Sequence, residues 1–341
     1  MNNSAFKVRL VSKIPLLSWL KLLAVSISFS VLAACSESPG GGGIGGSGKI
    51  DPVVNSGLLI GQVTAIDNLT VDGVQLSTDQ TNVVINGDSG ELEDVRVGMA
   101  VTVDVDNDNL QAEKIEYRAL VAGPVEIASA DGDTVTILGQ KVLISDTTVL
   151  DQLTTEDIFA GEVLEISGMR DENNAIAASF VRPYLLWENY FLTGQLEVIQ
   201  SEPLEYSISG TTVDFSAYLD SVNQQSLPQK LIGTTVVVEM QIRTPLAEEL
   251  VASTVTSIPE RNAEDYETVS VAGNASDITE TGSFTVQSFT FQINDETVFL
   301  DSLRNSIERV AITTGLKVSV SGLTLTGDSL LATEIVILQP D

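Results

Sequence analysis

Three aspartates at alternating positions, Asp104, Asp106 and Asp108, are the residues whose spacing best fits a metal site. Carboxylates at every second position open the loops that bind calcium, because this hard cation prefers oxygen ligands. The run departs from that pattern at its sixth position, Asn109, and at its twelfth, Ile115, where glycine and glutamate are usual. A solvated turn between two strands explains the same residues more simply, since Asn and Asp tolerate turn conformations. The sequence therefore allows a weak calcium site and favours a turn.

Catalytic chemistry is restricted by what the chain lacks. Its 341 residues include no histidine and one cysteine. A Ser-His-Asp triad is therefore excluded, as are cysteine-based zinc sites and iron–sulfur clusters. With 47 Asp and Glu residues, some pair of carboxylates will lie close together, so a carboxylate-based hydrolase stays as the weakest alternative. We predict that the protein is not an enzyme and has no catalytic residue, and no cofactor apart from the calcium considered above.

The single cysteine, Cys35, has a different chemical interpretation. Residues 1–34 carry four basic residues and no acidic one, and they end in an apolar stretch, Leu22–Ala34. This order is typical of a cleaved secretory signal, and the stretch is shorter than the about 20 residues of a membrane-spanning helix. Leu32-Ala33-Ala34 before Cys35 resembles the lipobox of bacterial lipoproteins. The resemblance implies that cleavage leaves Cys35 as the first residue, with lipid on its thiol.

A lipid anchor would place the protein in the bacterial cell envelope, with the membrane as a partner. By the same resemblance, Ser36 after the cysteine favours the outer membrane, with the protein facing either the periplasm or the outside. Residues 35–56 follow as a glycine-rich tether, because glycine at this density gives a flexible coil. A plain secretory signal with a chance cysteine is the alternative interpretation.

The chain is strongly acidic, with 17 Lys and Arg against the 47 acidic residues and a formal net charge of −30. Removal of residues 1–34 takes away four basic residues only, so the charge of the mature part becomes −34. This balance excludes a nucleic-acid partner, because phosphate binding needs a basic face.

The most aromatic stretch of the mature part is Tyr184–Phe191, which includes Trp187 and Tyr190. Exposed Tyr184, Trp187 and Tyr190 could stack on sugar rings or anchor a protein partner. The simpler interpretation is that these rings pack between two neighbouring domains and fix their angle.

The mature part repeats itself four times. Three landmarks recur in the same order: an opening glycine, a later glycine followed by alternating apolar residues, and a closing Ala-x-x-apolar motif. The opening glycines are Gly61, Gly123, Gly194 and Gly273, and the later ones are Gly98, Gly161, Gly233 and Gly315. The closing motifs begin at Ala112, Ala177, Ala252 and Ala332. We therefore predict four tandem domains, over residues 57–118, 119–184, 185–258 and 259–341.

Each repeat has the residue pattern of a small all-β barrel. Period-two alternation predicts three strands, then a short helix or loop, then two strands. Leu303, Ile307 and Val310 in the fourth repeat have helical spacing, as do Phe215, Leu219 and Val222 in the third. This order is that of an OB-like barrel. The predicted fold is all-β: four tandem five-stranded OB-like barrels, each with a short helix.

The repeat also resembles a known family of bacterial lipoproteins with tandem domains of the type called domain of unknown function 5666. That family shows an opening G-x-V, a T-V-x-G strand, a V-G-x-x-V-x-V strand and a closing A-x-x-I. The first repeat has all four, with Gly61, Thr70–Gly73, Val97-Gly98 and Ala112–Ile115. The fourth repeat departs at Ser288, where the T-V-x-G glycine is missing. The resemblance implies this fold and an envelope location, and it brings no activity.

From these features we expect a lipid-anchored envelope protein that acts as a non-catalytic scaffold or binding module. The alternative is a lipoprotein that binds a glycan or small ligand on the barrel faces or on the aromatic segment. An envelope protein or a glycan is the expected partner.

Overall fold

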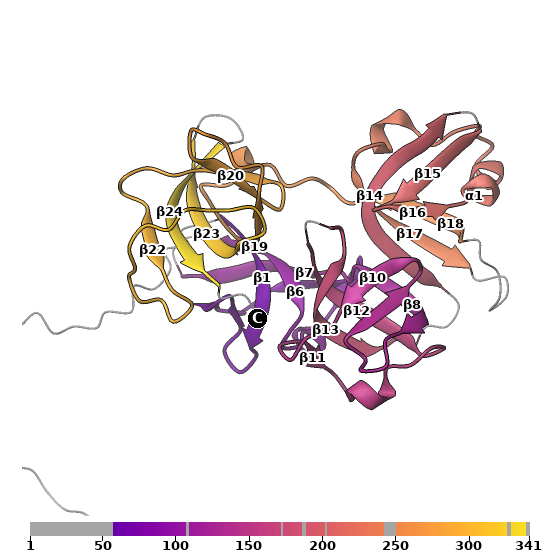
Figure 1. Ribbon diagram of the computed structural model, residues 1–341, viewed down its shortest axis with the longest axis horizontal. Helices are drawn as coiled ribbons and strands as arrows, with labels where there is room; N and C mark the ends of the chain where they lie inside the picture. The colour runs from indigo at the N-terminus through magenta and orange to yellow at the C-terminus, as the bar shows by residue number, and fades with distance from the viewer. Residues whose placement is uncertain are drawn as a thin grey trace, which may run out of the picture. The chain divides into compact units, whose positions relative to one another are not determined.

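The computed structural model describes residues 57–106, 109–171, 173–185, 189–201, 203–241, 250–325 and 329–338. This part of the chain is all-β with little helix (Figure 1). Its strands form five-stranded barrels that are distributed over two sheets, one of 13 strands and one of 11.

The strands follow one another in four groups along the chain. Group 1 contains β1 (Gly57–Ala65), β2 (Thr70–Val71), β3 (Val74–Gln75), β4 (Asn82–Ile85), β5 (Asp88–Gly90), β6 (Ala100–Asp106) and β7 (Gln111–Tyr117). Group 2 contains β8 (Val121–Ala128), β9 (Thr134–Ile137), β10 (Gln140–Leu143), β11 (Val149–Leu150), β12 (Val163–Arg170) and β13 (Ile176–Pro183). Group 3 contains β14 (Tyr190–Ser201), β15 (Leu204–Ile208), β16 (Thr211–Val213), α1 (Ser216–Ser221), β17 (Thr235–Gln241) and β18 (Val251–Ser257). Group 4 contains β19 (Thr268–Ser276), β20 (Ser283–Val286), β21 (Phe289–Gln292), β22 (Val298–Leu300), β23 (Lys317–Thr324) and β24 (Ser329–Ile337).

Group 2 shows how the five main strands close into a ring. β8 pairs with β9, β9 with β10, β12 with β13 and β12 with β8, all antiparallel. The ring is completed by parallel pairing of β10 with β13, at Val142 opposite Ile176. In group 1 the corresponding closure is a single parallel bridge between Ser77 and Gln111. Closure leaves few exposed strand edges, which limits pairing with other chains.

Group 1 also contains a hairpin that the sequence pattern does not predict. Strands β4 and β5 pair antiparallel, and β4 continues the sheet by parallel pairing with β7. The short strands β11 and β22 take the same parallel position beside β13 and β24. The segment before the later glycine is therefore extended in three groups.

Among the described residues the predicted short helix occurs in one group only. Phe215 and Val222 flank α1 as predicted, and segments of groups 1 and 2 form 3-10 turns instead (Leu92–Asp94 and Thr155–Asp157). The helix predicted from Leu303, Ile307 and Val310 is wrong. Arg304 has a φ of +63°, and the Asp301 carboxylate accepts hydrogen bonds from the backbone N–H of residues 303 and 305. These local bonds replace the first turn of a helix, and Leu303 is 81% exposed.

The second and third strands of each group are joined by a two-residue turn. In groups 1 to 3 both turn residues have positive φ, and the second is glycine: Asp72-Gly73, Leu138-Gly139 and Ser209-Gly210. This conformation matches the twist of a hairpin and strongly favours glycine at its second position. In group 4 Gln287 has a φ of +54°, and Ser288 is not in the positive region. The absence of glycine at Ser288 thus reflects a different turn type.

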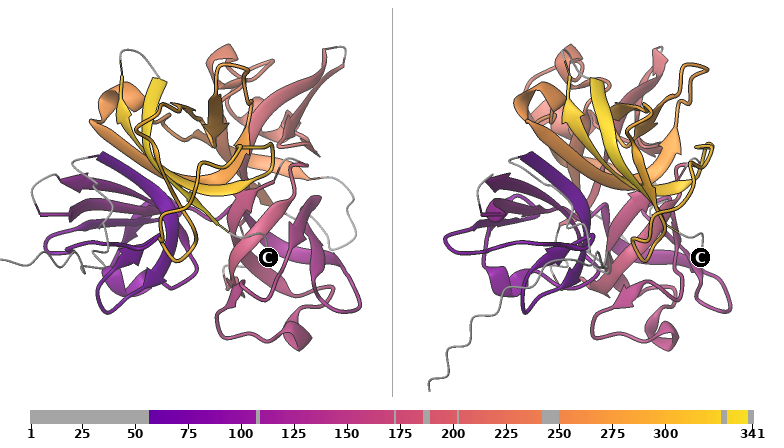
Figure 2. Two further views of the ribbon diagram at one scale, coloured as in Figure 1. Left: turned by 60° about the vertical axis from the view of Figure 1, so that its left-hand side comes forward. Right: turned by 90° about the vertical axis from the view of Figure 1, so that its left-hand side faces the viewer.

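Strand pairing also joins the four groups into two pairs. β1 pairs in parallel with β19, from Gly57 opposite Thr268 to Ile60 opposite Val271. Figure 2 shows the indigo strands of group 1 beside the orange and yellow strands of group 4 in both views. β8 pairs with β14 through Val121 and Ala122. The first and last groups therefore share a sheet, as do the two middle groups.

The buried cores follow these sheets and are mainly aliphatic. One cluster of buried side chains runs through groups 2 and 3. Another fills group 1 and includes Phe180 and Phe191 from outside that group. The third fills group 4 and includes Leu58 from β1. Leu58 thus reinforces the sheet that groups 1 and 4 share, and Phe180 and Phe191 connect group 1 with the other sheet. No helix of the described residues is long and apolar enough to cross a membrane.

Candidate binding cleft

Six candidate site residues lie outside the described residues. They are Leu32, Ala33, Ala34 and Cys35 of the lipobox, Trp187 of the aromatic segment, and Asp108, the third aspartate of the calcium candidate.

The two described tyrosines of the aromatic segment pack against protein. Tyr190 is buried in the core shared by groups 2 and 3. The ring of Tyr184 meets Phe191 edge-on, with ring centroids 5.8 Å apart, and its hydroxyl donates to the carbonyl of Asn189 at 3.0 Å. Neither tyrosine lines the cleft described below.

Asp104 and Asp106 project from the same face of β6, because side chains alternate along a strand. Oδ1 of Asp104 accepts hydrogen bonds from Arg261 at 2.5 Å and from the Tyr266 hydroxyl at 3.2 Å. Asp106 is exposed. Among the described residues no three acidic side chains gather in a way that could hold a metal ion. Asp104 thus has an arginine as its neighbour in the structure.

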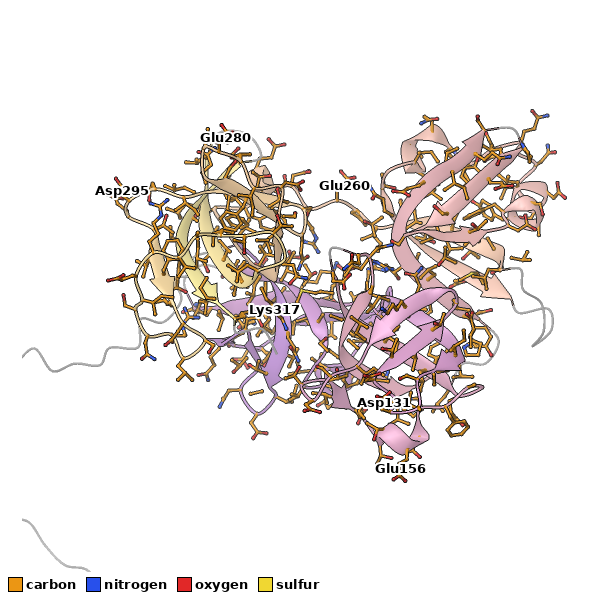
Figure 3. The ribbon with its side chains drawn as sticks, in the orientation of Figure 1. Asp131, Glu156, Glu260, Glu280, Asp295 and Lys317 are labelled. Atoms are coloured by element: carbon orange, nitrogen blue, oxygen red, sulfur yellow. The ribbon has the colours of Figure 1, made fainter. Side chains whose placement is uncertain are left out.

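A cleft of about 990 Å³ lies where groups 1, 2 and 4 meet. Its walls come from β1, β6 and β7, from the end of β12, from the middle of β13, from β19, and from the connection between β18 and β19. Glu260 on this connection is labelled in Figure 3. We define the cleft by six of its lining residues: Gln62, Thr102, Arg118, Arg170, Tyr266 and Asn274.

The connection is held against group 1 by charged groups. Arg261 bonds to Asp104 and, through its second nitrogen, to Glu116 at 3.2 Å. Glu116 also pairs with Lys114 at 2.9 Å and with Arg118 at 2.6 Å. Burial alone would raise the pKa of Glu116, but the hydrogen bonds from Lys114 and Arg118 outweigh it and lower the pKa. Glu116 therefore stays ionised and joins three cations.

Arg261 shows the matching effect. Burial acts to lower its pKa, but the hydrogen bond with Tyr266 and the negative charge of Asp104 outweigh burial and raise the pKa above its ordinary value. The guanidinium is charged under all ordinary conditions, so the contact between the connection and group 1 is a permanent ion pair.

Groups 1 and 2 are fixed to one another below the cleft by a buried glutamate. Glu165 on β12 is 1% exposed and accepts a hydrogen bond from the Tyr117 hydroxyl at 2.8 Å. Arg182 neutralises it at 2.7 Å and also lies over the Tyr117 ring, 5.8 Å from the centroid. Asn86 donates to the second carboxylate oxygen at 3.1 Å. A buried carboxylate is tolerated only with such partners, so this network sets the positions of β7 and β12 in the cleft walls.

Arg170, at the end of β12, brings a further cation to the cleft. It is half-buried, and its bonds run to neutral acceptors: Gln140 Oε1 at 2.5 Å, the Asn174 carbonyl at 3.1 Å and the Thr193 carbonyl at 3.1 Å. Burial lowers its pKa to about 10. No carboxylate of the described residues pairs with it, whereas Lys114, Arg118 and Arg261 each have one.

The sequence analysis missed the cleft and its basic residues. No local motif contains Arg118, Arg170, Arg261 or Tyr266. They meet because β1 pairs with β19 and because the Glu165 network joins groups 1 and 2. The one signal in the sequence is that basic residues are rare. The mature part has 13 of them, and four line this cleft.

Comparison with known families gives a match to the family described as Domain of unknown function (DUF5666). Two stretches match it, residues 122–182 and 272–336. The first runs from β8 to β13 and the second from β19 to β24. Together they cover less than half of the chain. Both the domain type and its repetition are therefore supported. No curated protein matches the chain.

Chemically, the cleft can bind a polar ligand. It offers guanidinium groups, carboxylates, amides and hydroxyls around a floor that includes Ile60, Ala100 and Val101. Such a mixture of apolar floor and few fixed polar groups is typical of small-molecule sites.

Proposed function

We propose that the protein is a non-catalytic binding module of the bacterial cell envelope, and that the cleft holds a small ligand or a glycan segment. The observation that carries this proposal is the cleft itself. Its volume of about 990 Å³ is near the upper end of the range of ligand pockets, roughly 300–1,000 Å³.

The arrangement of the walls supports this proposal. Three groups and one connection contribute to the cleft, and each is held by strand pairing or by ion pairs. A site with prearranged walls binds with a smaller loss of conformational freedom. Fixed polar groups of both charges supply orientation for a polar ligand.

The proposal includes the wider architecture. Four tandem OB-like domains, at 57–118, 119–184, 185–258 and 259–341, would build the cleft from domains 1, 2 and 4. The tether 35–56 would carry them on lipid attached to Cys35 at the outer membrane. OB-like barrels commonly use their outer faces to bind oligosaccharides, and β1 and β6 would supply such a face.

A variant that fills the cleft tests the proposal. Thr102 alternates with the buried residues Val101 and Val103 on β6, so its side chain points outward into the cleft. Thr102→Trp would block the space. Thr254→Trp, at an exposed position on β18 outside the cleft, is the matched control.

The measurement is the shift in melting temperature on adding each member of a panel of sugars, cell-wall oligosaccharides and small organic acids. At least one class should stabilise the unaltered protein and the Thr254→Trp variant but not Thr102→Trp, because a ligand that binds only the folded state raises its stability. The proposal fails if no class shifts the melting temperature, or if Thr102→Trp responds as the control does.

A further inference from the structure

The guanidinium of Arg170 has three of its five N–H donors in use. Both bonds of Nη1, to Gln140 and Asn174, and one bond of Nη2, to Thr193, run to uncharged oxygens. The Nε–H and the second Nη2–H have no acceptor among the described residues. Nε and Nη2 are neighbouring nitrogens, and a guanidinium binds a carboxylate through two parallel hydrogen bonds from such a pair.

The three bonds that Arg170 does make hold it in place. Its acceptors come from β10, from the turn between β12 and β13, and from β14, so groups 2 and 3 both fix the side chain. Little side-chain freedom is left to lose on binding. A fixed guanidinium with free donors is prearranged for its ligand.

The lack of a charged partner at Arg170 points to an anion, within a cleft whose lining holds five carboxylates and four cations. Taking a cation out of water without a counter-ion is unfavourable, and Arg170 is half-buried with neutral partners only in the described part of the chain. The remaining cations of the cleft already have carboxylate partners. A negatively charged ligand group therefore gains most at Arg170.

We propose that the ligand of the cleft carries a carboxylate, as a uronic acid or another small organic acid does, and that Arg170 binds this carboxylate. This inference rests on the proposed binding function and adds the chemical class of the ligand. A carboxylate matches the planar edge of a guanidinium, and the polar side chains Gln62 and Asn274 in the same cleft suit the hydroxyls of a sugar acid.

The test compares D-glucuronate with D-glucose, which differ in a carboxylate at one carbon, and adds succinate as a carboxylate without a sugar. Dissociation constants are measured by calorimetry or ligand-observed NMR with the whole mature protein, in about 0.15 M salt to screen the general negative charge. Glucuronate should bind about tenfold or more tightly than glucose, as expected for hydrogen bonds between charged groups. Tight binding of succinate alone would identify a simple organic acid instead of a sugar acid.

Variants locate the effect. Arg170→Gln should abolish the preference for glucuronate, and Arg170→Lys should reduce it several-fold because lysine keeps the charge but loses the two-pronged geometry. Arg96→Gln is the matched control. Like Arg170, the side chain of Arg96 bonds only to neutral oxygens among the described residues, here the carbonyls of Glu93 and Val95. It is exposed and outside the cleft. This variant should bind as the unaltered protein does.

Three results would overturn the inference. Equal binding of glucuronate and glucose would refute the carboxylate but leave the proposed binding function intact. If neither glucuronate nor succinate binds, the proposed carboxylate is refuted as well. The separate ligand panel with Thr102→Trp would then decide whether the cleft binds a ligand at all. An unchanged preference in Arg170→Gln would exclude Arg170. If Arg170→Gln fails to fold, the preference for glucuronate over glucose is compared between the unaltered protein and Arg170→Lys, and an equal preference would exclude Arg170.

Discussion

The carboxylate of Asp72 lies directly against the backbone of Gly61, with Oδ2 in the space that a Cβ at position 61 would occupy. Asp72 is the first residue of the turn between β2 and β3, and its Oδ1 accepts the backbone N–H of Gln62 at 3.1 Å. The same contact recurs along the chain. Leu138 covers Gly123 and Ser209 covers Gly194, each from the same turn position. The opening glycine of each repeat is thus the place where the hairpin folds onto the first strand.

Gly61→Ala should destabilise the protein by about 1–3 kcal/mol, the usual cost of forcing an extra carbon into a packed site. The measurement is the free energy of unfolding from urea denaturation. In a Gly61→Ala, Asp72→Gly double variant most of the loss should disappear, because the clashing carboxylate is gone and glycine accepts the positive φ of residue 72. Simple additivity of the two single effects would show that the contact is not the cause.

Asp72 should also make stability depend on pH. Its Oδ2 is sealed from solvent and has no hydrogen-bond partner. Burial raises the pKa of Asp72 to about 6, against the opposing effects of the Gln62 hydrogen bond and the charge of Lys317, a residue labelled in Figure 3. A carboxyl whose folded-state pKa lies above its unfolded value of 3.8 reduces stability above about pH 6. That loss, at most about 3 kcal/mol, fades as the pH falls from 6 towards 4.

Asp72→Asn should therefore be more stable than the unaltered protein at pH 7.5, by roughly 1–2 kcal/mol. The gain stays below the maximum because the amide nitrogen also finds no acceptor. The difference should vanish near pH 4, as measured by urea denaturation at several pH values. Asp88→Asn on exposed strand β5 is the control. A pH-independent difference between Asp72→Asn and the unaltered protein would contradict the assignment.

The ion pairs of Arg261 should contribute to stability, unlike an exposed pair. Arg261→Gln removes the partner of Asp104 and one partner of Glu116, whose side chains are only 23% and 11% exposed. We expect a loss of about 1–2 kcal/mol, above the typical value for surface pairs and below that for fully buried ones.

Arg309→Gln provides the comparison. Arg309 is 54% exposed, lies 3.7 Å from Asp295 and should contribute less than about 0.5 kcal/mol. Urea denaturation of both variants at low and high salt gives the result. Equal losses in the two variants would mean that Arg261 does not hold the connection.

Cys35 should carry lipid in cells. Metabolic labelling with a fatty-acid analogue should label the unaltered protein and a Ser36→Ala variant, and Cys35→Ala should remove all labelling because the chain has no other thiol. The mass of the mature N-terminus provides a direct check. A label that persists in Cys35→Ala would disprove the lipobox interpretation.

The landmark residues found in the sequence have physical roles that the pattern alone could not separate. Gly98, Gly161, Gly233 and Gly315 all have positive φ, between 83° and 101°, so their recurrence reflects backbone conformation. The opening glycines recur for a different reason, because the side chain of the facing turn leaves no space for a Cβ. Strand periodicity predicts two strands after the later glycine, and β6 and β7 are these strands in group 1, each with one face buried.

Other features depend on contacts that periodicity does not carry. The apolar spacing of Leu303 and Val310 imitates a helix, but Asp301 directs the chain into a turn. The hairpin of β4 and β5 gains its place by pairing with β7. Arg170 and Arg261 become cleft residues only after distant groups have met. A cleft between repeats leaves no local motif.

The parallel pairing of β1 with β19 has a consequence for the order of folding. Gly57 and Thr268 are about 210 residues apart, so their contact is among the most non-local in the molecule. During synthesis β1 emerges first, and its neighbour emerges when three other groups are already complete. In that interval the edge from Gly57 to Ile60 is unpaired, and Leu58 has no core to enter. The newborn chain therefore has this edge open while about 210 further residues are synthesised.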